Sequence, residues 1–177
     1  LSGKDLRSYT DSERSQKIGF ILQEPFLFSG TVRDNLVYGN SKYANTSSSD
    51  LIAILTELNL NELLSRFDNN LDRSIEGQGE SISLGQKQLI AFIRALLREP
   101  DILILDETTA NIDTVTEQLL EQVLAALPDK TTRVTIAHRL NTIANADVIY
   151  FVNVGEITRA GSLEQAMEML LHNKLES

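Results

Sequence analysis

The hydrophobic positions of this chain fall into short continuous runs separated by longer segments with helical spacing. Apolar runs of four to six residues with β-branched members are typical of strands buried in a sheet. They predict strands over Lys17–Leu22, Ile102–Leu105, Arg133–Ala137 and Val148–Asn153. Gly155 and Glu156 predict a hairpin turn into a further strand over Ile157–Ala160.

Segments with apolar residues three or four positions apart predict helices. The longest begins after Ser83, a favourable N-cap, and stops before Pro100. Other helices are expected after Asp50 as N-cap and over Glu62–Phe67, Thr114–Leu127, Leu140–Ala144 and Leu163–Leu171. Alternating strands and helices predict an α/β fold, with a parallel sheet and helices on both faces.

The stretch from about residue 29 to residue 97 has no convincing strand pattern. We therefore predict that residues 29–97 form an inserted helical subdomain. Residues 1–28 and 98–177 then form the α/β core.

Composition and charge narrow the possible functions. The chain has 177 residues, 42% of them hydrophobic, which is enough for one domain with a real core. It has no cysteine, so disulfides and thiol catalysis are excluded, and its two histidines fit no structural metal spacing. A net charge of −9 argues against nucleic-acid binding. No apolar run is long enough to cross a membrane, and the N-terminus does not have the pattern of a signal peptide.

Candidate chemistry follows the predicted strands. Asp106 and Glu107 end a buried strand, where one carboxylate can help to hold Mg²⁺ and the other can polarise a water for attack on a phosphate. The alternative is an ordinary apolar strand that reaches solvent. His138 and Gln23 also follow strands. A lone histidine in a loop is more often structural or solvated, and Gln23 alone indicates little.

Ser83 and Gly85 precede or open the longest helix, where free N–H groups and the helix dipole favour an anion. An ordinary serine N-cap is the alternative.

Taken together, these segments resemble the ATP-binding domain of ATP-binding-cassette (ABC) exporters. The sequence that follows Gln23 is similar to the Q-loop, and Ser83-Leu84-Gly85-Gln86 to the signature motif. Ile102–Asp106 with Glu107 resembles the Walker B strand and its glutamate. Residues 110–113, ending in Asp113, resemble the D-loop, and residues 136–140 the switch-histidine loop.

This resemblance implies a P-loop NTPase-like core that uses ATP and Mg²⁺. Gln23 and Asp106 would contact Mg²⁺, Glu107 would be the general base, and His138 would contact the γ-phosphate. The residues expected at ATP from the partner side of a head-to-tail dimer are Ser83, Leu84, Gly85, Gln86 and Asp113.

The resemblance also implies partners. They are a second nucleotide-binding domain, identical or different, and the transmembrane domain of the same transporter, at the cytoplasmic face of a membrane. The chain itself is expected to be soluble. A chromosome-maintenance or repair ATPase would need heptad arms and a basic face, which this chain lacks.

The family's phosphate loop, Gly-x-x-x-x-Gly-Lys-Ser/Thr, does not occur in the chain. We therefore expect a domain truncated at its N-terminus, without its first strands, and inactive alone although its parent hydrolyses ATP. The alternative is a shortened, non-catalytic cassette that supplies its signature motif in trans to a partner ATPase.

Overall fold

The computed structural model describes residues 1, 3–77, 82–106, 112–137, 146–162, 164–165 and 167–168. The chain divides into two compact units, Leu1–Val134 and Thr135–Ser177. Across the described residues, no helix combines the length and the apolar character that a membrane crossing requires.

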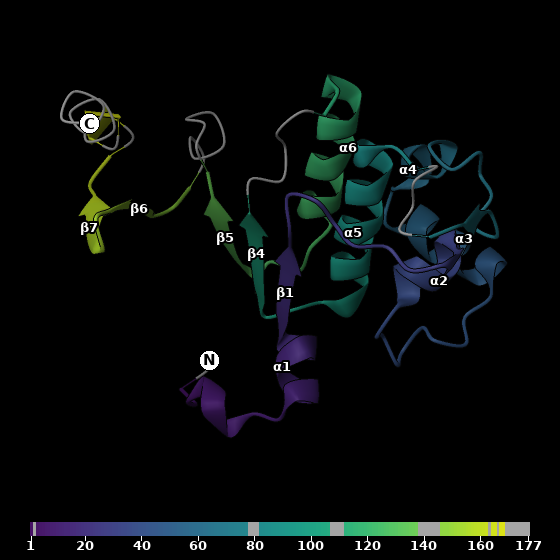
Figure 1. Cartoon of the computed structure of the whole chain (residues 1–177), viewed down its shortest axis with the longest axis horizontal. Helices are drawn as coiled ribbons and strands as arrows, with labels where there is room; N and C mark the ends of the chain where they lie inside the picture. The colour runs from purple at the N-terminus through teal and green to yellow at the C-terminus, as the bar shows by residue number, and fades with distance from the viewer. Residues whose placement is uncertain are drawn as a thin grey trace. The chain divides into compact units, whose positions relative to one another are not determined.

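A three-stranded sheet organises the first unit. Its order is β1 (Ile18–Ile21), β4 (Ile102–Asp106) and β5 (Thr132–Ile136). β1 and β4 pair in parallel, with Ile18 opposite Ile102 and Ile21 opposite Leu105, and the three arrows point the same way in Figure 1. The predicted strands are confirmed to within one residue at most ends, and so is the parallel sheet with helices.

Two long helices lie side by side next to this sheet (Figure 1). They are α5 (Leu84–Arg98) and α6 (Thr114–Ala125); α5 packs on β1, and α6 packs on α5. α5 ends at Glu99, whose left-handed backbone (φ 50°) turns the chain before Pro100. α6 ends two residues earlier than predicted, at the Ala126 cap that precedes Pro128.

The strand order explains which face of the sheet is covered. Successive right-handed crossovers from β1 to β4 and from β4 to β5 place both helices on one face. Leu103 and Leu105 are accordingly buried, whereas Phe20 of β1 is 53% exposed.

A short segment precedes β1. It contains a 3₁₀ turn, η1 (Leu6–Ser8), and α1 (Asp11–Lys17), which begins with a reciprocal capping box between Thr10 and Glu13. Lys17 Nζ lies 2.8 Å from Asp101 Oδ2, so an ion pair fixes the start of β1 beside the start of β4.

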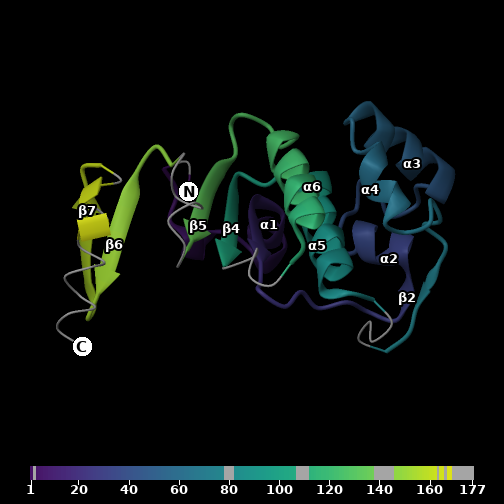
Figure 2. The same cartoon turned by 90° about the horizontal axis from the view of Figure 1, so that it is seen from above.

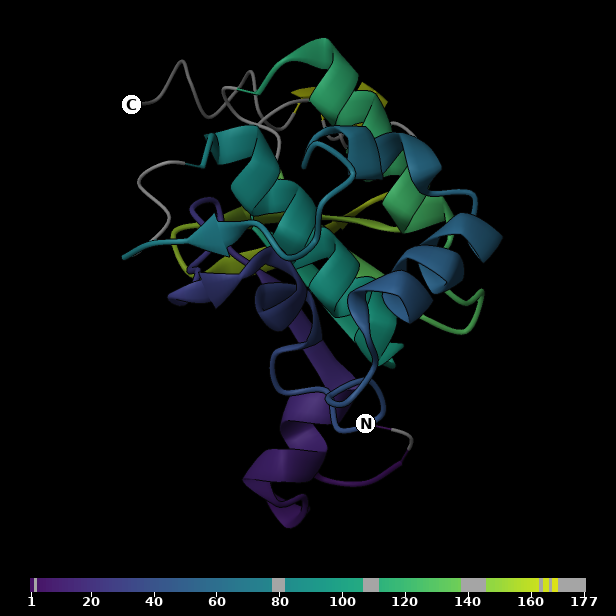
Figure 3. The same cartoon turned by 90° about the vertical axis from the view of Figure 1, so that its right-hand side faces the viewer.

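Between β1 and α5 lie α2 (Val32–Val37), α3 (Ser48–Glu57) and α4 (Asn61–Ser65), which Figure 2 and Figure 3 show beside α5. Two predictions for this region are wrong. α3 is capped by Ser47, whose hydroxyl accepts from the Asp50 amide at 3.1 Å, so Asp50 lies inside the helix. The region also contains an antiparallel pair, β2 (Gly30–Thr31) with β3 (Ser74–Ile75).

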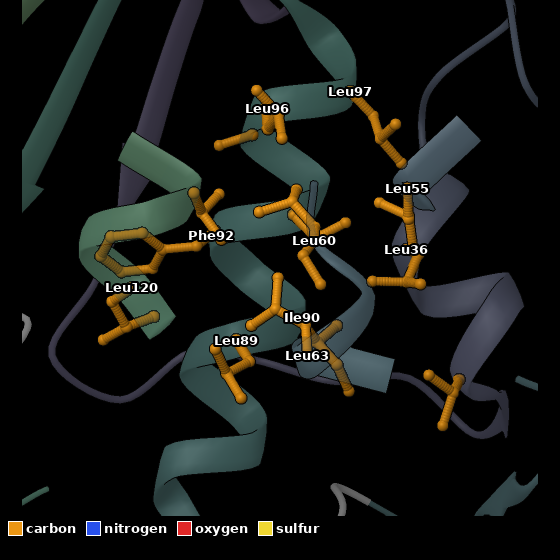
Figure 4. Packing of buried hydrophobic residues seen from close by; sticks show 14 of the residues in the cluster. Leu36, Leu55, Leu60, Leu63, Leu89, Ile90, Phe92, Leu96, Leu97 and Leu120 are labelled. Carbon is orange, nitrogen blue, oxygen red and sulfur yellow. The ribbon is translucent and has the colours of Figure 1, made fainter. Parts of the chain in front are cut away.

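One hydrophobic core joins these helices to α5 and the sheet. Figure 4 shows Leu36 of α2, Leu55 of α3 and Leu63 of α4 packed around Ile90 of α5. All four side chains are fully buried. Burial of each such side chain contributes about 1.5–3 kcal/mol to folding, so the helical segment is anchored to α5.

The second unit contains the antiparallel hairpin of β6 (Ile149–Asn153) and β7 (Glu156–Ala160). Gly155, at φ +83°, makes the turn, which confirms the predicted hairpin. The predicted helix over Leu140–Ala144 lies outside the described residues, and so does most of the one over Leu163–Leu171.

Candidate functional site

Gln23 and Asp106 lie at the same edge of the sheet. β1 and β4 run in parallel with Ile21 opposite Leu105, so the residues that follow these two positions leave the sheet together. Gln23 is exposed and Asp106, the last residue of β4, is half-buried. Ligands of α/β proteins bind at the carboxyl ends of strands.

An amide oxygen and a carboxylate are ligands that suit Mg²⁺. This cation usually takes one or two carboxylates and fills its remaining positions with water and phosphate oxygens. Within the described ranges no cluster of three or more His, Cys, Asp or Glu side chains could hold a metal. The carboxylate of Asp106 and the side-chain amide of Gln23 are groups of the kind that bind a magnesium ion shared with a phosphate ligand. Glu107 and His138 lie outside the described residues.

The start of α5 carries the Ser83-to-Gln86 segment. Ser83 is the N-cap: its hydroxyl accepts from the Gln86 amide at 3.2 Å, and Gln86 Oε1 accepts from the Ser83 amide at 3.1 Å. This confirms the predicted cap, and the cap leaves the hydroxyl proton of the exposed Ser83 available to a ligand. Leu84 begins the helix and is half-buried.

Gly85 brings α5 close to α6. A Cβ placed on Gly85 would lie 3.0 Å from Cγ2 and 3.1 Å from Oγ1 of Thr116, a buried residue in the first turn of α6. The N-terminal turns of the two helices therefore lie against each other. The free N–H groups and the dipoles of α5 and α6 make the region around these two helix N-termini favourable for negative charge.

Asp113 is the N-cap of α6. Its carboxylate accepts from the Thr116 amide at 3.0 Å and from the Thr116 hydroxyl at 2.6 Å. These two hydrogen bonds, helped by Arg66, lower the pKa of Asp113 below its ordinary value. Asp113 is therefore ionised at neutral pH beside the helix start that it caps.

Arg66 connects the two helix starts, which the sequence does not predict. Its carbonyl oxygen accepts from Gln86 Nε2, and its Nη2 lies 3.4 Å from Asp113 Oδ1. The structure thus places Ser83, Gly85, Gln86 and Asp113 in one group, and Gln23 with Asp106 in another. No local pattern marks Arg66, because its partners are 20 and 47 residues away.

Gln88 is a second residue absent from the sequence prediction. It is fully buried on α5, and its Nε2 donates to the carbonyl oxygen of Gln23 at 3.2 Å. A polar residue on the apolar stripe of a helix is the signal that could have identified it. Gln88 links α5 to the loop after β1.

Comparison with known proteins finds similar sequences and structures along most of the chain. The ABC transporter family profile matches residues 1–110. YfiC of Bacillus subtilis, described as an uncharacterized ABC transporter ATP-binding protein, is 41% identical over 165 residues, which cover 93% of this chain and 27% of YfiC. Leptomycin B resistance protein pmd1 of Schizosaccharomyces pombe is 38% identical over 162 residues, covering 92% of this chain and 12% of pmd1.

Among solved structures, a bacterial Atm1-family ABC exporter with ATP bound is similar in fold, with a TM-score of 0.75 and 28% identity. The similarity covers 97% of this chain and 29% of the exporter chain. The chain therefore spans less than a third of the length of each of these relatives.

Proposed function

Because the chain belongs to the ABC transporter family, we propose that it supplies part of an ATP-hydrolysing domain that drives export across a membrane. The observation that carries this proposal is the pairing of Ile21 with Leu105, which brings Gln23 and Asp106 to one edge of the sheet. The proposed reaction is transfer of the γ-phosphoryl group of ATP to water, giving ADP and phosphate.

Gln23 and Asp106, together with Glu107 and His138, have proposed roles in hydrolysis. Asp106 and the Gln23 amide would hold Mg²⁺, which would supply charge neutralisation between the phosphate oxygens. Glu107 would accept a proton from the attacking water, and His138 would donate a hydrogen bond to a γ-phosphate oxygen. The roles of Glu107 and His138 rest on the sequence motifs alone.

The group at the start of α5 and α6 is proposed to bind ATP held by another copy or a related domain. Ser83 is exposed at the start of α5, and Leu84, Gly85 and Gln86 share its first turn. The N–H groups of Leu84 and Gly85 and the Ser83 hydroxyl would bind phosphate oxygens, with Gln86 capping the helix beside them, and Asp113 would lie at the same dimer interface. ATP would thus lie between two domains arranged head to tail.

An aromatic cluster is the proposed contact for the transmembrane domain. Phe28 stacks on Tyr38, with ring centroids 4.0 Å apart, and Phe26 meets Phe28 edge-on at 5.1 Å. Phe26 and Tyr38 are each about half exposed. Exposed aromatic side chains gathered on one surface are common at protein interfaces.

The chain alone is proposed to bind ATP weakly or not at all. Its sequence lacks the glycine-rich loop and lysine that hold the β- and γ-phosphates in this family. Each charge-assisted hydrogen bond contributes about 1.5–3 kcal/mol, so the loss of several removes most of the affinity. Calorimetric titration with Mg²⁺ and ATP should show no binding, and a micromolar dissociation constant would contradict this part of the proposal.

Hydrolysis is tested in a chimaera of YfiC in which this chain replaces the matching 165 residues, called here the YfiC chimaera. We expect it to hydrolyse ATP and Asp106→Asn to abolish that activity. The alternative, a non-catalytic cassette that acts in trans, predicts a chimaera that does not hydrolyse ATP, because it contains no intact partner ATPase. A folded chimaera that binds ATP and never hydrolyses it would contradict the main proposal.

A further inference from the structure

Side chains from helices hold the main chain of the loop after β1. Gln88 Nε2 of α5 donates to the Gln23 carbonyl oxygen at 3.2 Å. Six residues further along the same helix, Arg94 Nη1 lies 3.4 Å from the carbonyl oxygen of Phe26. α5 therefore contacts the loop at two points along its main chain.

Asn35 of α2 makes the third attachment. Its Oδ1 accepts from the Phe28 amide and its Nδ2 donates to the Phe28 carbonyl oxygen, both at 2.8 Å. Arg94 Nε in turn donates to the Asn35 carbonyl oxygen at 2.7 Å. The loop is thus joined to α5 and α2, and a displacement of these helices displaces the loop.

Gln88 is the attachment nearest to the proposed magnesium site. Its side chain is 0% exposed, and its Oε1 has no hydrogen-bond partner among the described residues. A buried amide with an unpaired oxygen lowers the stability of the fold, whereas a leucine at the same position would pack without that cost. Its position is explained if the bond to Gln23 has a function that packing alone does not provide.

The geometry points to Gln88 as a positioning residue, and we propose that it sets the place of Gln23 relative to Asp106 according to the position of α5. Ser83, which caps α5, is five positions before Gln88, about 7.5 Å along a helix at 1.5 Å per residue. A phosphate group of the ATP held by the partner domain binds at Ser83–Gln86. Its binding thus biases the position of Gln23 in the proposed magnesium site of this domain. This inference rests on the proposed function.

The test is a double-mutant cycle in the YfiC chimaera. Gln88→Met keeps the length and volume of the side chain and removes the donor. We expect kcat for ATP hydrolysis to fall about three- to tenfold, the range of one ordinary hydrogen bond, with KM for ATP within about twofold. Gln122→Met, at an exposed position of α6, is the matched control and should leave kcat unchanged.

The cycle with Gln23→Ala separates positioning from general packing. If Gln88 acts through Gln23, Gln88→Met lowers kcat by less than about twofold in the Gln23→Ala background. The proposal would be overturned if Gln88→Met lowered kcat equally with Gln23 and with Gln23→Ala, or if it did not lower kcat with Gln23 present. Gln88→Asn retains the amide but is one methylene shorter, and it replaces Gln88→Met should that variant fail to fold.

The two proposals fail in different ways. A YfiC chimaera without any hydrolysis contradicts the proposed function and this inference with it. An active YfiC chimaera in which Gln88→Met behaves like Gln122→Met contradicts the inference alone. Amide exchange of residues 22–28 in the unfused chain gives a check without activity: it should increase in Gln88→Met and not in Gln122→Met, and unchanged exchange would count against the proposal.

Discussion

Gly85 lies so close to Thr116 that a Cβ on the glycine would meet the Thr116 methyl carbon at 3.0 Å. The contact brings the first turn of α5 against the first turn of α6. It gives the glycine of the Ser83–Gln86 segment a packing role in addition to the ligand role implied by its motif.

Gly85→Ala should therefore destabilise the chain by about 1–3 kcal/mol, the usual cost of an added methyl group in a tight contact. Thr116→Ser removes the methyl group and keeps the hydroxyl that bonds Asp113. The double variant should recover part of the loss. Urea denaturation measures the free energy of unfolding of the wild type, the two single variants and the double variant. If the effects of the two substitutions simply add in the double variant, the contact is contradicted.

Asp113 should make stability depend on pH. Its folded-state pKa is lowered by the hydrogen bonds from Thr116, so its stabilising contribution is complete above the unfolded pKa of about 3.9. The contribution is lost as the pH falls through the lower folded pKa. Asparagine also caps helices well, and Asp113→Asn should therefore keep most of the stability at pH 7.

Comparison of the wild type with Asp113→Asn isolates the effect of the Asp113 charge on stability. Between pH 7 and pH 3, Asp113→Asn should lose less stability than the wild type, because it has no carboxylate to protonate. Denaturation midpoints at several pH values provide the measurement. Parallel curves for the two proteins would show that the Asp113 charge contributes nothing.

Strands and long helices of the first unit could be predicted because their signals are local. Ile102–Leu105 is continuously apolar, and Ser83 with Pro100 brackets α5. β2 and β3 have two residues each, too few to show a period of two. Ser47 and Asp50 are both good caps, and the hydrogen bond between them, which the sequence does not show, decides that Ser47 is the cap.

In the candidate site, too, features with local sequence signals could be predicted and features that depend on packing could not. Gln23, Ser83 and Asp106 could be predicted because each lies where a strand or helix pattern begins or ends. Gln88 could not be linked to Gln23, since the two are 65 residues apart and meet only through the packing of α5 on β1. The sequence indicates which residues can do chemistry, and packing decides which residues hold them in place.

Asn35→Ala should be among the most destabilising polar substitutions. Asn35 is 1% exposed and bonds both main-chain groups of Phe28 as well as the carbonyl oxygen of Thr31. Removing its amide leaves buried groups unpaired, at about 1–3 kcal/mol each, so we expect a loss of about 2–4 kcal/mol. Asn45→Ala, at an exposed position, is the control and should change the free energy of unfolding by less than about 0.5 kcal/mol; an equally small effect of Asn35→Ala would contradict the role of these bonds.

Glu107→Gln should separate ATP binding from hydrolysis in the YfiC chimaera. A general base typically contributes at least about a hundredfold to the rate, and the amide of glutamine accepts no proton from water. We therefore expect kcat to fall by at least about a hundredfold while ATP still binds and holds a dimer together. Phosphate release and light scattering with ATP measure the two properties, and wild-type turnover in the variant would exclude Glu107 as the base.

The face of the sheet that carries Phe20 should promote self-association of the chain. Phe20 projects from β1 on the side opposite the buried Ile21, is 53% exposed, and pairs in register with Ile104 of β4. An apolar ring presented by a sheet face is a favourable contact for a second copy. Phe20→Ser should therefore raise the monomer fraction in sedimentation velocity at micromolar concentrations. Val115→Ser on α6 changes a side chain that is 48% exposed; because it leaves the sheet face intact, it should not shift the distribution. A monodisperse wild-type monomer, or equal effects of the two substitutions, would show that this face does not drive association.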